Sequence, residues 1–452
     1  MRPLVVALAA SILPLAPLPA QQGSPAGPIP VERLAARREA LAKRLGTGVV
    51  ALRSGMERDI EGSYPQDSDY REDNDFFYLT GVEVPNAWLV LTVKAGALSG
   101  AALYLPPRDT VSHYRSEQWV GRQLTPGPEA TALTGIKDVR SADLVGRELP
   151  AVVFAPESAA RQGSLYVKTG PGQSETPFLR DSILGRAQAG AGLRVGDLAE
   201  PMSRLRLVKD ADELARLRKA IAITEEAQRD AMRRIEPGMY EYQTEALIEY
   251  DFRRNGAERL GFPSIVGSGP NSTLLHYDKN RRRMEAGDLV VMDIGAEYGY
   301  YTADVTRTVP VSGSFTPRQR AIYDLVLGAQ QAAIKAVRPG VTIKQLDQIA
   351  RDHMRATSGT LCGKVTCDQH FVHGLSHWLG MDVHDVGRID TPLAPGMVLT
   401  IEPGVYISEE QLGVRIEDDV LVTANGSEVL SAGAPKLPQE IESLMREGAT
   451  VP

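Results

Sequence analysis

The residues best suited to chemistry are histidines and carboxylates in the second half of the chain. Four of the seven histidines fall within fifteen residues: His370, His373, His377 and His384. Four carboxylates lie in apolar segments on either side of them: Asp293, Asp304, Glu402 and Glu417. Oxygen ligands with at least one imidazole and no thiolate favour Mn(II), with Co(II), Fe(II) or Zn(II) able to substitute. Two ions about 3.5–4 Å apart would deprotonate a bridging water and stabilise the oxyanion on an attacked carbonyl. The pattern therefore predicts a hydrolytic metal centre.

The first pair of carboxylates is expected to meet across a β-hairpin. A two-residue turn at Tyr298-Gly299, where glycine permits positive φ, would pair Asp293 with Asp304. Directly opposed residues have Cβ atoms roughly 4.5–5.5 Å apart, so both carboxylates could reach one metal centre. Two solvent-facing acids are the alternative, but the apolar residues around both aspartates indicate buried strands. Without a cation these like charges would repel.

The second pair could meet in the same way. Glu402 and Glu417 both follow apolar strand residues, and a longer loop centred on Glu409-Glu410 would place them opposite one another. An ordinary acidic turn is the alternative for Glu417, but the apolar residues on both sides of it favour a strand. The two hairpins would together form the ligand cage.

In these motifs the chain resembles the pita-bread metallopeptidases, and among them aminopeptidase P and its close relative prolidase. The resemblance covers most of the chain after its first twenty residues. It implies five metal ligands, the fourth of which also acts as the general base: Asp293, Asp304, His377, Glu402 and Glu417. It also implies three histidines that hold the substrate carbonyl and shuttle protons: His276, His373 and His384.

The same resemblance points to residues near the substrate. Tyr406 and Arg415 lie where relatives carry supporting groups, and an arginine there would orient carboxylates and offset their charge. Residues 70–81 look like the stretch by which the amino-terminal domain approaches the active site, with Asp75 at its polar position. An ordinary strand and turn is the alternative for that stretch. A dipeptidase of the prolidase type would need a cation for the carboxylate of its dipeptide, and Arg388 is a candidate for that role.

The activity implied by the resemblance is release of the N-terminal residue from peptides whose second residue is proline. Proline removes the hydrogen of the scissile amide and fixes the backbone direction, so a matching pocket can recognise a bond that other peptidases resist. A dipeptidase of the prolidase type is the nearest alternative, and a non-catalytic pita-bread binding module is another. The complete ligand set argues against the binding module. The segment between Gly387 and Pro395 looks shorter than in many relatives, which leaves the accepted peptide length open.

The elements that must position these residues indicate two domains. Strand-like runs alternate with helical or irregular segments from about residue 28 to residue 200, which is typical of an α/β domain. Amphipathic helices are expected over 210–235 and 316–339, and Thr342 is expected to cap another. We therefore expect an amino-terminal α/β domain over 21–200 and an α+β pita-bread catalytic domain, with a curved antiparallel sheet, over 201–452.

The first twenty residues are expected to be a secretory signal peptide. Arg2 precedes an apolar run over residues 4–18 that is too short to span a membrane. Cleavage after Ala20 would export the protein to the periplasm or the medium with no membrane anchor. Export would allow Cys362 and Cys367 to pair, and two free thiols are an equal alternative.

Composition limits the partners. A net charge of −7 argues against a nucleic-acid partner, because phosphate binding needs clustered lysine and arginine. A hydrophobic content of 43% over 452 residues suffices for a large core. Peptide substrates fit this balance, and the family resemblance implies a homo-oligomer.

Overall fold

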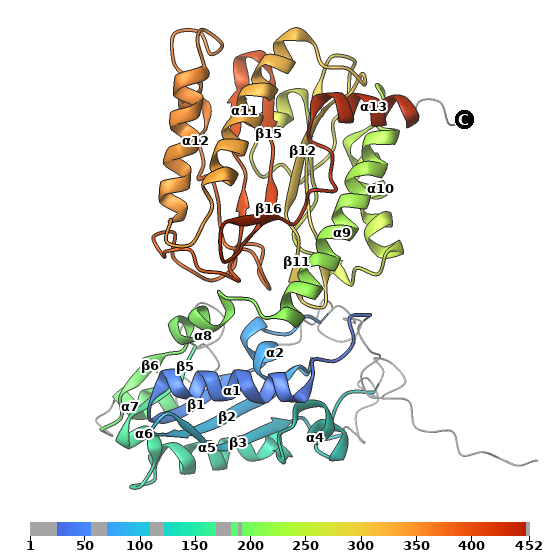
Figure 1. The fold of residues 1–452 in the computed structure, drawn as a ribbon. Coiled ribbons are helices and arrows are strands. Elements are labelled where there is room, and N and C mark those ends of the chain that lie inside the picture. Colours follow the sequence, from blue (N-terminus) through green and yellow to red (C-terminus); the bar gives the residue numbers. More distant parts are fainter. Residues whose placement is uncertain (1–24, 56–69, 109–121, 169–181, 189–191, 449–452) are drawn as a thin grey trace, which may run out of the picture.

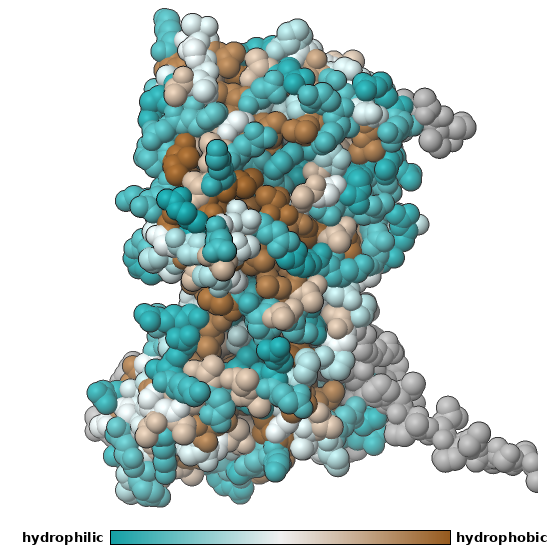
Figure 2. Space-filling view, in the orientation of Figure 1, coloured by the Kyte–Doolittle hydropathy of each residue, from teal (hydrophilic) through white to brown (hydrophobic). Residues whose placement is uncertain are grey.

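The computed structural model describes residues 25–55, 70–108, 122–168, 182–188 and 192–448, and Figure 1 shows that they form two lobes. The predicted signal peptide, residues 1–20, lies outside the described residues. None of the helices within those ranges combines the length and apolar character that crossing a bilayer requires. Figure 2 shows apolar side chains reaching the surface at the waist between the lobes and across the middle of the upper lobe.

The amino-terminal lobe contains a six-stranded mixed sheet in the order β4-β3-β2-β1-β5-β6. Its strands are β1 (Gly48–Arg53), β2 (Trp88–Lys94), β3 (Ala97–Leu105), β4 (Asp138–Ser141), β5 (Ser164–Val167) and β6 (Val195–Asp197). Side chains alternate between faces, so Val50 and Leu52 pack on one side and Val49 and Ala51 on the other. The first side is covered by α1 (Val31–Leu45), α2 (Asn74–Thr80), α4 (Pro128–Thr134) and α8 (Ala199–Arg206). The second is covered by α5 (Val145–Phe154) and α6 (Ala159–Gln162). The expected α/β fold of this part is confirmed.

Long capped helices cover the sheets of the second lobe. They are α9 (Ala211–Arg234), α10 (Glu241–Arg254), α11 (Pro317–Ala336), α12 (Ile343–Thr357) and α13 (Pro438–Gly448). Asp210, Thr316 and Thr342 each form a capping box with a residue three positions on, which satisfies backbone donors at the helix start. These three helix starts are where the sequence predicted them.

The strands of the second lobe pair only with antiparallel neighbours among the described residues. They are β7 (Arg259–Leu260), β8 (Ile265–Ser268), β9 (Leu289–Ile294), β10 (Ala296–Tyr298), β11 (Tyr301–Thr302), β12 (Val305–Pro310), β13 (Val398–Ile401), β14 (Gly404–Ile407), β15 (Leu412–Arg415), β16 (Asp418–Val422) and β17 (Ser427–Val429). These strands form four small sheets, β11-β10-β7, β12-β9-β8, β13-β16-β17 and β14-β15. Helices α9 and α11 contact different strands of this set, and the strands lie between the two helical groups (Figure 1). The expected α+β pita-bread architecture is confirmed.

Cys362 and Cys367 form a disulfide in the loop after α12. The sequence left pairing and free thiols equally open. The bridge closes the segment that leads into the histidine cluster.

Candidate metal centre

The hairpin that carries the two aspartates turns one residue later than predicted. Asp293 pairs with Thr306 and not with Asp304, because Gly299 and Tyr300 make the turn with φ angles of 58° and 74°. The prediction of a turn at the preceding pair was therefore wrong. A type I′ turn needs positive φ at both central residues. The register shifts by two residues, so both aspartates remain on one face as diagonal neighbours.

Tyr300 adopts positive φ because tertiary contacts hold its side chain. Its ring stacks on Phe77 of α2 with centroids 3.6 Å apart. Its hydroxyl donates to Glu83 and accepts from the backbone N–H of Glu72 at 3.0 Å. Positive φ is uncommon for a bulky residue, so nothing in the local sequence marks this turn. The amino-terminal lobe therefore helps to set the register of a hairpin in the second lobe.

Glu402 and Glu417 face one another as predicted. The pairing of β13 with β16 and the pairing of β14 with β15 follow one common register. On that register Glu402 stands opposite Glu417, and η5 (Ser408–Glu410) closes the connection between them. The expected loop centre at Glu409-Glu410 is confirmed.

His377 contacts carboxylates of both hairpins. Its Nε2 lies 3.3 Å from Asp304 Oδ2 and 3.6 Å from Glu402 Oε1. Its Nδ1 lies 3.1 Å from the carbonyl oxygen of Trp378. A carbonyl only accepts, so Nδ1 carries the proton and Nε2 offers a lone pair toward the carboxylates. One possible ligand atom each of Asp304, His377 and Glu417 lies within 4.8 Å of the other two.

The carboxylates outnumber the cations beside them. Burial and Asp293 raise the pKa of Asp304 well above its usual value, and burial and Asp304 do the same for the pKa of Glu417. Burial raises the pKa of Glu402 to about 7. The Oδ1 atoms of Asp293 and Asp304 are buried with no hydrogen-bond partner among the described residues. Unpartnered carboxylate oxygens in a crowded anionic site are what divalent cations bind, so this donor set fits the predicted metal centre.

Arg415 connects the carboxylate of Asp293 to Tyr406 and, through Tyr406, to His373. Its Nη2 donates to Asp293 Oδ2 at 2.6 Å, and its Nη1 donates to the hydroxyl of Tyr406 at 3.0 Å. The Tyr406 hydroxyl lies 2.8 Å from Nε2 of His373, whose Nδ1 lies 2.8 Å from the carbonyl of Gly374. The carbonyl fixes the proton on Nδ1, so Tyr406 donates to Nε2. Burial and Arg415 lower the pKa of His373 to about 4, which keeps the ring neutral.

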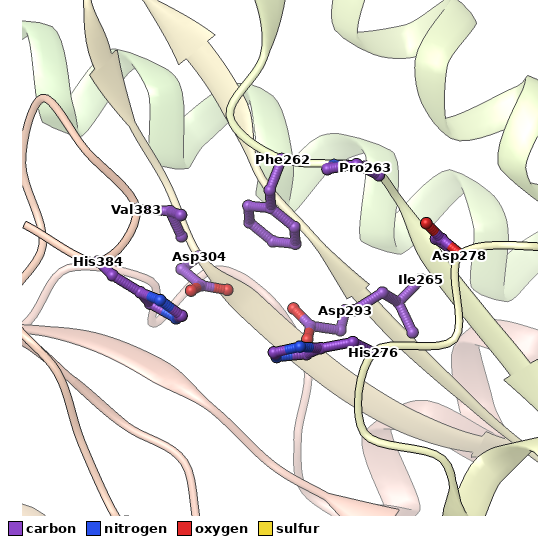
Figure 3. A pocket seen from close by; sticks show the side chains of 9 residues that line it. All are labelled: Phe262, Pro263, Ile265, His276, Asp278, Asp293, Asp304, Val383 and His384. Carbon is purple, nitrogen blue, oxygen red and sulfur yellow. The ribbon is translucent and has the colours of Figure 1, made fainter. Parts of the chain in front are cut away.

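A cavity of about 220 Å³ opens beside the two aspartates, and Figure 3 shows Asp293 and Asp304 pointing into it between His276 and His384. The ring of His384 packs edge-on to His377 with centroids 4.3 Å apart. The rest of the wall contains Asp278 and four apolar side chains: Phe262, Pro263, Ile265 and Val383. Sequence reasoning missed these apolar residues, because a cavity wall and a protein core use the same residue types.

Two predicted substrate residues lie away from this cavity. Both carboxylate oxygens of Asp75 are held in ion pairs, by Arg206 at 2.7 Å and by Lys168 at 2.9 Å. Arg388 is exposed and pairs with Asp390 at 2.8 Å. Within the described part of the chain, the residues that line the cavity include neither Asp75 nor Arg388. Tyr406 and Arg415 contact His373 and Asp293, as described above.

Two buried glutamines hold the two hairpins from the helices above them. Gln228 of α9 donates to the carbonyls of Met292 and Val305, which adjoin Asp293 and Asp304. Gln330 of α11 donates to the carbonyls that precede Glu402 and Glu417, at 3.3 and 3.2 Å. Each carboxylate thus has a neighbouring backbone group fixed by a helix. A glutamine within a helical pattern gives no sign of this role in the sequence.

Comparisons with known proteins agree with this geometry. Residues 215–424 match metallopeptidase family M24, and residues 34–159 match the aminopeptidase P N-terminal domain. The Xaa-Pro aminopeptidase of Escherichia coli is 36% identical over 440 residues, which are 90% of this chain and 96% of that protein. The structure of aminopeptidase P from E. coli with the inhibitor Pro-Leu aligns with a TM-score of 0.82 at 32% identity, over 94% of this chain and 100% of that one. The Xaa-Pro dipeptidase of Pyrococcus furiosus is 42% identical over 231 residues, 50% of this chain and 64% of that protein.

Proposed function

The chain belongs to metallopeptidase family M24 and is a metallo-aminopeptidase that cleaves the N-terminal Xaa-Pro bond, and we propose that it does so with two divalent metal ions. The observation that carries the proposal is the largely buried group of Asp304, His377 and Glu417, with Glu402 Oε1 3.6 Å from Nε2 of His377. Among the described residues, Oδ1 of Asp293 and Oδ1 of Asp304 are buried with no hydrogen-bond partner. Asp293, Asp304, His377, Glu402 and Glu417 would hold the ions.

The residues around the cage divide the chemistry among them. Divalent ions would supply Lewis-acid activation of water and of the scissile carbonyl. Glu402, 3.7 Å from His373 through its Oε2, accepts a proton from the attacking water. His276 and His384, which flank the aspartates at the cavity, hold the carbonyl oxygen as its charge grows. His373, oriented by Tyr406, takes part in moving the proton toward the departing proline nitrogen.

The apolar wall supports recognition of proline. Phe262, Ile265 and Val383 line the same cavity as Asp293 and Asp304. A pyrrolidine ring is apolar and rigid, so it fits such a wall with little loss of conformational entropy.

Longer peptides are favoured over dipeptides as substrates. A dipeptidase needs a cation for the carboxylate of its substrate, and the cavity-lining residues within the described part of the chain include no lysine or arginine. Arg388, the candidate for that task, pairs with Asp390 outside the cavity. Identity to the dipeptidase of P. furiosus covers only half of this chain, so it does not outweigh this observation.

Three matched peptides test the proposal. Mass spectrometry would follow the products from Arg-Pro-Pro, Arg-Ala-Ala and Ala-Pro after the protein is loaded with Mn(II), and an EDTA-treated sample is the control. Release of arginine from Arg-Pro-Pro alone is the expected result. Cleavage of Ala-Pro alone would reassign the chain as a dipeptidase, and no cleavage with metal bound would reopen the binding-module alternative.

The metal, the location and the assembly state complete the proposal. Mn(II) suits a site with four carboxylates and one imidazole, and metal analysis of the protein purified from its own host would test it.

Export is supported by the residues that resemble a signal peptide and by the Cys362–Cys367 disulfide, since disulfides persist in oxidising compartments. An exported protein beginning at Gln21 is expected by N-terminal sequencing. The family resemblance implies a homo-oligomer, which light scattering would measure.

A further inference from the structure

The loop that carries His384 is folded tightly and held from its outer side. The N–H of Asp385 donates to the carbonyl of Trp378 at 2.9 Å, and the N–H of Gly380 donates to the carbonyl of Asp382 at 3.2 Å. A Cβ on Gly380 would lie 2.1 Å from Oδ2 of Asp385, so the loop can close only with glycine there. Val383 and His384, between these anchors, line the cavity.

Arg206, at the end of α8, holds this loop through its planar guanidinium. It is 2% exposed. Its Nη2 donates to Asp385 Oδ1 at 2.7 Å and to Asp382 Oδ2 at 2.6 Å. Lys209 donates to the other oxygen of Asp385 at 3.0 Å. The residue next to His384 is therefore fixed through both of its carboxylate oxygens.

The amino-terminal lobe reaches the same loop through Arg206. Nη1 of Arg206 donates to Asp75 Oδ1 at 2.7 Å, and Asp75 is itself fixed by Lys168. Arg71 and Asn74 donate to the carbonyl of Met381 at 3.1 and 3.2 Å. Residues 70–81, the segment that the sequence predicted to approach the active site, thus contact the His384 loop through Arg71 and Asn74, and through Asp75 by way of Arg206.

We propose that Arg206 is a positioning residue that sets His384 in its working orientation by joining Asp75 of the amino-terminal lobe to Asp385. The inference rests on the proposed function, in which His384 holds the substrate carbonyl. A planar guanidinium that donates from Nη1 to Asp75 and from Nη2 to Asp385 fixes direction as well as distance, so it ties the loop to the amino-terminal lobe in a defined orientation. His384 is exposed at the cavity, so its orientation depends on the ring contact with His377 and on the anchored backbone of its loop.

Stability alone is a weaker explanation for this cluster. Buried ion pairs recover little net free energy, because the charges lose their hydration. Apolar packing already joins the lobes, since Leu217 and Ile221 of α9 share one core with Leu34 of α1 and Phe76 of α2. What the charges add is a defined geometry at one loop.

The test compares Arg206→Lys with Arg37→Lys. Arg37 is also a buried arginine between the lobes, 3.5 Å from Asp210 and 3.7 Å from Glu213. Its ion-pair, hydrogen-bond and ring partners within the described ranges are these two carboxylates and Tyr78, none of which belongs to the His384 loop. Lysine keeps the charge but lacks the planar guanidinium whose two Nη atoms donate separately to Asp75 and to Asp385. We expect Arg206→Lys to lower kcat for Arg-Pro-Pro by about tenfold or more with unchanged metal content, because small displacements of catalytic groups are costly. Arg37→Lys should lower Tm while kcat stays within about twofold of wild type.

Combination with His384→Ala separates positioning from stability. If Arg206 acts through His384, then Arg206→Lys should change the remaining kcat of His384→Ala by less than about twofold. An equal loss of kcat in both backgrounds, or no loss in the wild-type background, would overturn the inference and leave the proposed function standing. Unchanged turnover in His384→Ala would instead reject the role assigned to His384 itself. Asp75→Asn, which keeps the side-chain volume, repeats the comparison if Arg206→Lys does not fold.

Discussion

Asp304 and Glu417 lie in a buried position that two carboxylates would not share without a cation or protons. Both pKa values are raised by burial and by neighbouring carboxylates, and Oδ1 of Asp304 has no hydrogen-bond partner among the described residues. The site is therefore arranged for a bound ligand at the expense of the stability of the metal-free protein.

Asp304→Asn should separate metal binding from folding. Asparagine has the shape of the protonated carboxyl group, so the metal-free variant should unfold at the same Tm as wild type or higher. Loss of a ligand should lower metal content and reduce kcat/KM by about 100-fold or more, since groups that only support ligands cost about 10- to 100-fold. Asp324→Asn, at an exposed ion pair on α11, is the matched control and should change neither the metal content nor kcat/KM. Full turnover with normal metal content would refute the assignment of Asp304.

Tyr406→Phe tests the chain of donors from Arg415 to His373. Removing the hydroxyl leaves Nη1 of Arg415 and Nε2 of His373 without their shared partner. We expect kcat/KM to fall about tenfold with metal content retained. Tyr323→Phe removes another buried tyrosine hydroxyl, one that donates to the carbonyl of Lys436 at 2.8 Å, and should leave kcat/KM unchanged. An equal effect of both variants would mean that Tyr406 contributes only to packing.

Among the elements, the two hairpins form the centre by different routes. The Glu402 and Glu417 hairpin follows from its strand pattern, because its register continues through two strand pairs. The Asp293 and Asp304 hairpin depends on a turn whose second residue, Tyr300, is held by the other lobe. Its register is the more sensitive of the two to changes in the turn.

Gly299→Ala should disturb that turn. The φ of Gly299 is 58°, and an added Cβ would lie 2.6 Å from the Cβ of Ala26 and 2.6 Å from Nη1 of Arg216. We expect the free energy of unfolding to fall by more than the roughly 1–2 kcal/mol that a left-handed alanine costs, and Mn(II) affinity to fall as well. Gly340→Ala is the control, because φ there is 88° and, apart from its chain neighbours, no described residue has an atom within 4 Å of the added Cβ. Differential scanning calorimetry and metal titration would measure both effects, and equal losses in the two variants would contradict this account.

At the scale of the whole molecule, metal binding and folding stability should be linked through pH. In the metal-free folded protein Glu402 keeps its proton to about pH 7, whereas the unfolded chain loses it near its usual value of 4.5. Between these values the folded state binds more protons, so the free energy of unfolding should fall as pH rises, by up to about 3 kcal/mol. Bound cations favour the ionised form and should remove this loss.

Thermal unfolding from pH 5 to pH 8 would check the link. The gain in Tm on adding Mn(II) to EDTA-treated protein should grow with pH across this range. Metal-free Glu402→Gln should lose the part of the pH dependence that Glu402 contributes, because glutamine does not titrate. A metal-free wild-type protein with the same pH profile as Glu402→Gln would contradict the prediction.

The sequence by itself determined the features that depend on residue type and on near neighbours. The types of donor group at the candidate centre follow from the carboxylates and histidines of the sequence. The helix starts follow from caps three residues apart, and the second hairpin follows from apolar alternation. Each of these features arises from residues close together in the sequence or from its local apolar pattern, so it can be predicted from the order of the residues alone.

Only the tertiary structure decided the features that depend on distant contacts. Stacking on Phe77 sets the turn at Tyr300, Asp75 forms ion pairs with Arg206 and Lys168, and chain folding turns Phe262 and Val383 into a cavity wall. In each case the partner lies far along the chain. Local residue preferences do not contain such contacts, since packing and charge pairing between lobes override them.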